Sequence, residues 1–240
     1  GTIYFTDSLN HVIRKLTPAG VITTLGGGGT AGFSGDNGPV ARATFAFPGA
    51  IAADSAGNIF FADTLGRRIR KVDTQGTITT FGGDGLPFPP DPGPAVGSSY
   101  GIVSALAFDS QGNLLVTDSF WDQVLRITPT GIQSFFAGTG DTGFAGDGEP
   151  PLSAKFFSPS GLAFFGSTLF IADRDNHRIR KISPDGTITT VAGTGEPGFS
   201  LAGGAANATP RRTISVARQA SSLLAFEQLP PAVLVGHQQF

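Results

Sequence analysis

A short segment ending in aspartate recurs along the chain and dictates its organisation. Its four copies end at Asp7, Asp63, Asp118 and Asp173, at intervals of 56, 55 and 55 residues. A turn glycine follows the same period, at Gly20, Gly76, Gly131 and Gly186. Because two independent markers hold one period, we predict four related units, at about 1–56, 57–111, 112–166 and 167–212.

Four short apolar runs accompany each repeat after the first, and the set at the second repeat, whose first run lies just before the unit boundary, shows them most clearly. They span 50–54, 58–63, 68–73 and 77–81, and they are rich in Ile, Val, Phe and Thr between Gly- and Asp-containing turns. This pattern is typical of β-strands joined by hairpins. A four-stranded sheet cannot bury both of its faces alone, whereas sheets packed face to face around an axis can. The predicted fold is therefore all-β, a β-propeller of about four blades, each a four-stranded antiparallel sheet.

The pattern decays after residue 212. Segments within 213–240 resemble the first, second and third runs of a unit, so we interpret this region as a degenerate fifth repeat. The first unit lacks its own first run, which residues 213–217 could supply to close the ring. The alternative is that the chain is part of a larger propeller, completed by flanking blades or by another chain.

The fourth unit carries a family signature. The segment 172–195, with its Asn176-His177 pair, resembles an NHL repeat, and the pair recurs as Asn10-His11. Insertions at 32–36 and 143–147, Gly-Phe-Ser/Ala-Gly-Asp, resemble those of the longer NHL repeats of secreted bacterial proteins. The resemblance covers residues 1–200. It implies a propeller used mostly as a binding scaffold, with a few members acting as lyases, and an extracellular or periplasmic location.

Composition excludes several classes of protein. The chain has no cysteine, so a disulfide scaffold is impossible. The net charge of −2 gives no general attraction to nucleic acid or to anionic membranes. No uninterrupted apolar run is long enough to span a bilayer. The histidines lack metal-ligand spacing, and we predict neither a metal site nor a cofactor.

Residues present in every unit lie on a circle around the axis and cannot converge on one substrate. We therefore interpret the four repeated aspartates as structural. An arginine follows seven residues later in three units, at Arg14, Arg70 and Arg180, and the third unit has Leu125 instead. We expect each arginine to pair with its aspartate across the hairpin.

Residues present in one unit only are better candidates for function. Phe120 and Trp121, the only tryptophan, replace polar turn residues, and exposed aromatic residues often anchor partners. Packing against a neighbouring blade is the competing interpretation of Trp121. Arg67 and Arg68 belong to the densest positive cluster, which would suit an acidic partner or RNA. A proline-rich segment, Leu86–Pro94, replaces the Gly-Phe-Ser-Gly-Asp insertion in the second unit.

The sequence favours a non-enzymatic scaffold that binds a protein or carbohydrate partner through its loops, with Phe120, Trp121, Arg67 and Arg68 as candidate contacts. The first alternative is a propeller enzyme of the lyase or lactonase type acting at the central channel. No unique acid–base pair supports it. The second alternative is RNA binding, which the overall charge disfavours.

Overall fold

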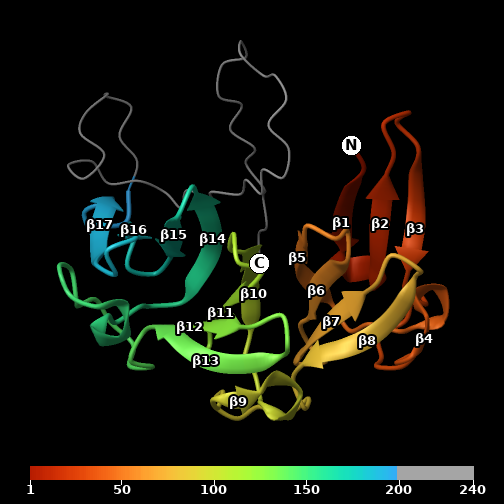
Figure 1. Cartoon of the computed structure of the whole chain (residues 1–240), viewed down its shortest axis with the longest axis horizontal. Coiled ribbons are helices and arrows are strands. Elements are labelled where there is room, and N and C mark those ends of the chain that lie inside the picture. Colours follow the sequence, from red (N-terminus) through yellow and green to blue (C-terminus); the bar gives the residue numbers. More distant parts are fainter. Residues whose placement is uncertain (199–240) are drawn as a thin grey trace.

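Four antiparallel sheets follow one another around a common axis in the computed structural model, which describes residues 1–198 (Figure 1). The chain is thus all-β and a β-propeller, as the repeat predicts. The degenerate repeat predicted at 213–240 lies outside the described residues.

Within each sheet the main strands lie in sequence order from the axis outward. We call the four sheets blades 1 to 4. Blade 1 consists of β1 (Ile3–Asp7), β2 (Val12–Leu16) and β3 (Ile22–Gly26). Blade 2 consists of β5 (Pro48–Ala53), β6 (Ile59–Asp63), β7 (Arg68–Val72) and β8 (Thr77–Gly82). Blade 3 consists of β10 (Val103–Phe108), β11 (Leu114–Asp118), β12 (Gln123–Ile127) and β13 (Ile132–Ala137). Blade 4 consists of β14 (Pro159–Phe165), β15 (Thr168–Asp173), β16 (Arg178–Ile182) and β17 (Ile188–Ala192).

The core forms three clusters, one at each junction between successive blades. Side chains of a strand alternate between the two faces of its sheet. In β6, Ile59 and Phe61 join the cluster with blade 1, while Phe60 and Ala62 join the cluster with blade 3. The middle blades bury both faces, which explains why their second runs are continuously apolar rather than alternating.

The long insertions of the first three units cross to the outer edge of the following blade. A two-residue strand, β4 (Gly38–Pro39), pairs with β8, and β9 (Gly93–Pro94) pairs with β13. Short 3₁₀ turns follow, η2 (Val40–Arg42) and η3 (Ala95–Gly97), and η4 (Pro151–Ser153) lies at the same place in the third unit. A further 3₁₀ turn, η1 (Ser8–Asn10), joins β1 to β2. Because an open sheet edge invites pairing with other chains, these insertions protect the blades they cover.

Candidate binding face

Strand register places two sets of loops at the same end of the blades. Pro48 pairs with Asp63, Val103 with Asp118 and Pro159 with Asp173, so the start of each innermost strand lies beside the end of the second strand. The hairpins after β1, β6, β11 and β15 therefore share one end with the segments that lead into β5, β10 and β14. We call this end the loop face.

The repeated aspartates bind the loop segments of this face through hydrogen bonds. Asp63, Asp118 and Asp173 each accept a backbone N–H from the segment leading into their own blade, at 2.6 Å from Ala46, 2.7 Å from Gly101 and 2.9 Å from Phe157. The three carboxylates are fully buried. Burial raises the pKa of Asp63 against the opposing effect of the Ala46 N–H and Arg70, and it raises the pKa of Asp173 to about 6.

Three of these aspartates face an arginine of the next strand. The N···O distances are 3.1 Å for Asp7–Arg14, 3.6 Å for Asp63–Arg70 and 3.5 Å for Asp173–Arg180. Arg70 and Arg180 have fully buried side chains, whereas that of Arg14 is 31% exposed.

Asp118 has no arginine partner in its own blade, because Leu125 takes that position. Its carboxylate instead accepts four backbone N–H groups, from Gly101, Ile102, Phe120 and Trp121. Burial raises the pKa of Asp118 even though these hydrogen bonds oppose the shift. Asp118 therefore holds both loops of blade 3 in place through backbone contacts alone.

One hairpin residue connects each of blades 1 to 3 to the next blade, a role that the sequence did not indicate. His11, Arg67 and Asp122 occupy the same hairpin position and adopt positive φ angles of 56°, 51° and 53°. His11 Nδ1 accepts the N–H of Phe47, and Asp122 Oδ1 accepts the N–H of Ser158. The residue type is histidine in the first and fourth units but arginine and aspartate in the second and third, so the sequence did not reveal a shared structural role.

Three of the four candidate contacts lie together where blades 2 and 3 meet. Arg67 Nη1 donates to the carbonyls of Tyr100 and Gly101, at 3.2 and 3.0 Å. A Cβ atom added at Gly101 would lie 2.6 Å from Phe120 Cβ and 3.0 Å from Trp121 Cδ1. The two rings meet edge to face, 5.0 Å apart. Gly101 is thus the point on which the guanidinium and both aromatic residues converge.

The two aromatic residues differ in exposure. Phe120 is 60% exposed, whereas Trp121 is half-buried, and its Nε1 is buried without an acceptor among the described residues. The contacts of Trp121 with Gly101 and Phe120 lie within its own blade, and Phe120 is the more exposed of the two rings.

Arg68, the fourth candidate, lies apart from this group. Its guanidinium donates to the carbonyls of Gly66 and Asp84 and lies 3.8 Å from the centroid of the Phe33 ring. Arg70, from the same positive cluster, is buried between carboxylates. The cluster is therefore largely used inside the fold.

Several exposed apolar side chains lie on the loop face. Leu9, Leu65 and Phe120 occupy equivalent hairpin positions in blades 1 to 3, and Ile102 and Phe157 are exposed in the segments leading into β10 and β14. The opposite end has polar turns, in which Asp54, Asp73 and Asp109 accept backbone N–H groups. Exposed apolar side chains lie at this end too, namely Phe165, which is 81% exposed, and Ile3, Val21, Ile22 and Ile132.

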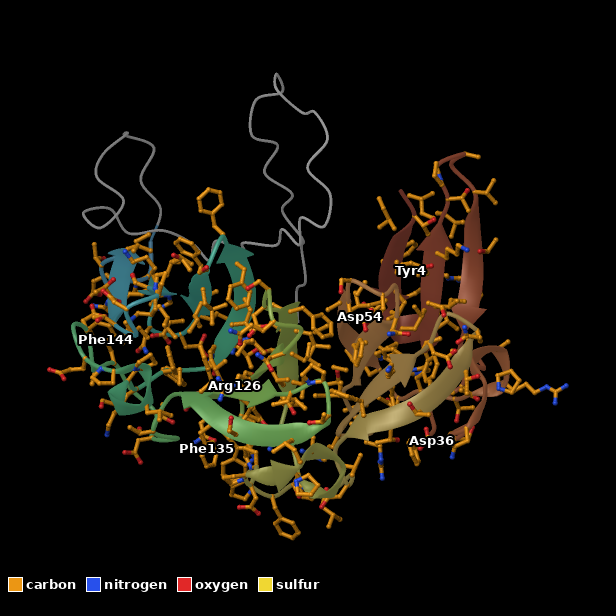
Figure 2. All side chains as sticks on the ribbon, in the orientation of Figure 1. Tyr4, Asp36, Asp54, Arg126, Phe135 and Phe144 are labelled. Carbon is orange, nitrogen blue, oxygen red and sulfur yellow. The ribbon has the colours of Figure 1, made fainter. Side chains whose placement is uncertain are left out.

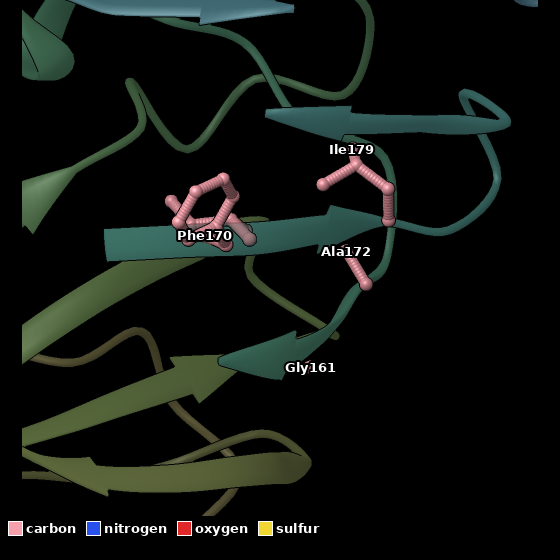
Figure 3. A pocket seen from close by; sticks show the side chains of 5 residues that line it. Gly161, Phe170, Ala172 and Ile179 are labelled. Carbon is pink, nitrogen blue, oxygen red and sulfur yellow. The ribbon is translucent and has the colours of Figure 1, made fainter. Parts of the chain in front are cut away.

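Blade 4 has a shallow depression that is too small to enclose a water molecule (Figure 3). Gly161, Phe170, Ile171, Ala172 and Ile179 line it, so it offers no acid or base. Among residues 1–198, no group of three or more His, Cys, Asp or Glu side chains is arranged to hold a metal ion. Within the same residues, every helix is too short to cross a bilayer.

Two relatives share parts of this sequence. The chain is 45% identical over 53 residues to NHL repeat-containing protein 2 of Gallus gallus, and 43% identical over 74 residues to Protein SUPPRESSOR OF QUENCHING 1, chloroplastic, of Arabidopsis thaliana. These matches cover 22% and 30% of the chain and 7% of each relative. No protein-family model matches the chain.

Solved structures share the propeller fold. A streptogramin B lyase structure matches with a TM-score of 0.51 at 22% identity, over 79% of this chain and 50% of the other. An auxiliary nutrient binding protein from Bacteroides thetaiotaomicron matches with a TM-score of 0.56 at 17% identity, over 80% of this chain and 44% of the other. The chain thus spans about half the length of these two propellers.

Proposed function

We propose that this chain, an NHL-type β-propeller, is a non-enzymatic scaffold that binds a protein or carbohydrate partner on its loop face. The observation that carries the proposal is the convergence of Arg67, Phe120 and Trp121 on Gly101. Aromatic and arginine side chains are the residues that most often dominate binding energy at interfaces. A rigid set of blades would present this group without a large ordering cost.

The surroundings of the group support binding rather than acid–base catalysis. The repeated carboxylates of blades 2 to 4 are buried beneath the loop face and engaged by backbone N–H groups. Phe120, in contrast, offers a flat apolar ring, and Arg67 offers a cation beside it. A sugar ring or an aliphatic side chain suits the ring, and an acceptor group suits the guanidinium. The resemblance to secreted NHL proteins supports an extracellular or periplasmic location for such a partner.

Phe120→Ala is expected to weaken partner binding at least tenfold, because it removes the exposed anchor while leaving the buried core intact. Binding would be measured on a panel of immobilised polysaccharides and on a panel of folded extracellular domains, which separates the two classes of partner. Phe165→Ala is the matched control, since it removes a still more exposed phenylalanine from the opposite end of the blades. Equal losses in both variants, or no change in Phe120→Ala, would contradict the proposal.

RNA binding is tested separately. Because Arg68 and Arg70 are engaged inside the fold and the net charge is −2, we expect no salt-dependent retention on heparin or on single-stranded RNA columns. Retention at about 50 mM salt that Arg67→Ala removes would instead favour the nucleic-acid alternative.

A further inference from the structure

Two insertions dock on the next blade in the same way. Phe33 lies with its ring 3.8 Å from the guanidinium carbon of Arg68 and 4.7 Å from that of Arg70. Asp36 follows in the same insertion and binds Arg70 at 2.8 Å. Figure 2 shows Asp36 at the outer part of blade 2 and Phe144 at the outer part of blade 4.

The second of these insertions repeats the geometry. Phe144 lies 3.8 Å from Arg178 and 4.8 Å from Arg180, and Asp147 binds Arg180 at 2.7 Å. In both blades the insertion also reaches the outer strand. The N–H of Asn37 donates to the carbonyl of Ile78, and that of Gly148 donates to the carbonyl of Ile188, both at 2.8 Å. An arginine and an isoleucine of the blade thus receive a Phe–Asp insertion.

Blade 3 replaces every part of this arrangement. Leu125 takes the place of the arginine, and Gln133 takes the place of the isoleucine. The insertion that covers blade 3 is the proline-rich one. Gln133 Nε2 donates to the Asp91 carbonyl and to Ser98 Oγ, and its Oε1 accepts the hydroxyl of Tyr100.

The residue at the end of each insertion changes in step with these pairs. Tyr100 occupies this position in the proline-rich insertion, whereas the two Phe–Asp insertions carry Phe45 and Phe156 there. The two kinds of insertion therefore meet two different surfaces. The Phe–Asp insertions meet an arginine and an isoleucine, and the proline-rich insertion meets a leucine and a glutamine.

Blade 1 displays one of these surfaces without its insertion. It carries Arg14 and Ile22, the same pair as blades 2 and 4, yet no insertion within residues 1–198 reaches it. The side chain of Arg14 is 31% exposed, against 0% for Arg70 and Arg180, and Ile22 is 58% exposed, against 0% for Ile78. Arg14 instead donates to Thr24 Oγ1, whereas the equivalent Thr80 donates to Asp36.

We propose that Arg14 and Ile22 form a docking site for the Gly-Phe-Ser/Ala-Gly-Asp insertion of a further NHL repeat placed before blade 1 around the axis. The pairing of insertion and blade surface selects which repeat follows which. Charge and shape both support this occupant. An aspartate would complete the pairing of Arg14, a phenylalanine ring would cover its guanidinium, and the insertion backbone would bond the carbonyl of Ile22.

The test is an exchange experiment with four fusion proteins. A second copy of residues 112–166, which carries the Phe144–Asp147 insertion and an innermost strand, is joined directly before Gly1, so that the repeat period continues. The matched control joins residues 57–111, which carry the proline-rich insertion with Tyr100. Each fusion is made with the natural blade 1 and with the double substitution Arg14→Leu and Ile22→Gln.

The expected result is a reversal. With the 112–166 fusion, the double substitution should lower the melting temperature by roughly 4–8 °C, on the scale expected for losing one buried charge pair and its packing. With the 57–111 fusion, it should raise the melting temperature or leave it unchanged. Hydrogen exchange in β3 should slow at least tenfold in the two matched proteins relative to the two mismatched ones.

Two results would overturn the proposal. Equal shifts from the double substitution in both fusions would mean that blade 1 does not distinguish the insertions. A shift of the full size in the unfused 240-residue chain would mean that another part of the chain already occupies the Arg14 site.

Discussion

Arg70→Leu is expected to lower the free energy of unfolding by about 3–5 kcal/mol, the range found when one partner of a buried ion pair is removed. The Arg70 side chain is fully buried, and so is that of Asp63, whose carboxylate it faces at 3.6 Å. The substitution would leave the buried Asp63 carboxyl with one N–H donor from the backbone and without its nearest cation. It would also remove the partner of Asp36 and the cation that covers Phe33.

Arg14→Leu is the matched control for this prediction, because it changes the same position of a repeat in a solvated setting. The Arg14–Asp7 pair is partly exposed on both sides, so its loss should cost less than about 1 kcal/mol. Urea denaturation of both variants gives the comparison. Equal costs would mean that Arg70 acts as an apolar spacer and that its charge contributes little.

The fold is predictable from this sequence because the same pattern of strands and turns recurs in four units. The second unit indicates runs at 58–63 and 77–81, and the observed strands are β6 at Ile59–Asp63 and β8 at Thr77–Gly82. Short β-branched runs between Asp-x-x-Gly turns leave few alternatives to hairpins. The period then requires face-to-face packing of the blades.

The docking of the insertions could not be predicted in the same way. Phe33 and Asp36 meet arginines that lie more than thirty residues away in the next unit. Within one unit, nothing distinguishes a phenylalanine in a glycine-rich loop from an exposed one. Only the comparison of three blade junctions reveals the partner, through the joint change to Leu125 and Gln133.

The candidate site was predictable in part, for a geometric reason. Searching for residues unique to one unit led to Phe120, Trp121 and Arg67, which the structure brings together, and to Arg68, which it does not. Arg67 ends the hairpin with a positive φ angle, and Arg68 begins β7 and is directed to the insertion. Leu9 and Leu65 were missed, because an apolar residue next to a strand end is usually assigned to the strand.

Asp118→Ala is expected to lower the free energy of unfolding by about 3 kcal/mol, since it leaves four backbone N–H groups without their acceptor. It should also weaken partner binding, because these N–H groups belong to the two loops that carry Gly101, Phe120 and Trp121. Trp121 is the only tryptophan, so its fluorescence reports the loosening directly. The emission maximum should shift to longer wavelength under native conditions.

Asp118→Asn separates the acceptor role from the charge. Three of the four N–H groups bond to Oδ1, which the amide keeps, and only the Gly101 N–H bonds to Oδ2. Because burial already disfavours the charge of Asp118, this variant should lose only about 1 kcal/mol. Asp7→Ala, at the partly exposed equivalent in blade 1, should cost less than about 1 kcal/mol and leave the fluorescence unchanged. If Asp118→Ala resembled Asp7→Ala in both measurements, the hydrogen bonds of Asp118 would not hold the loop face, and the rigid presentation of Phe120 would need another cause.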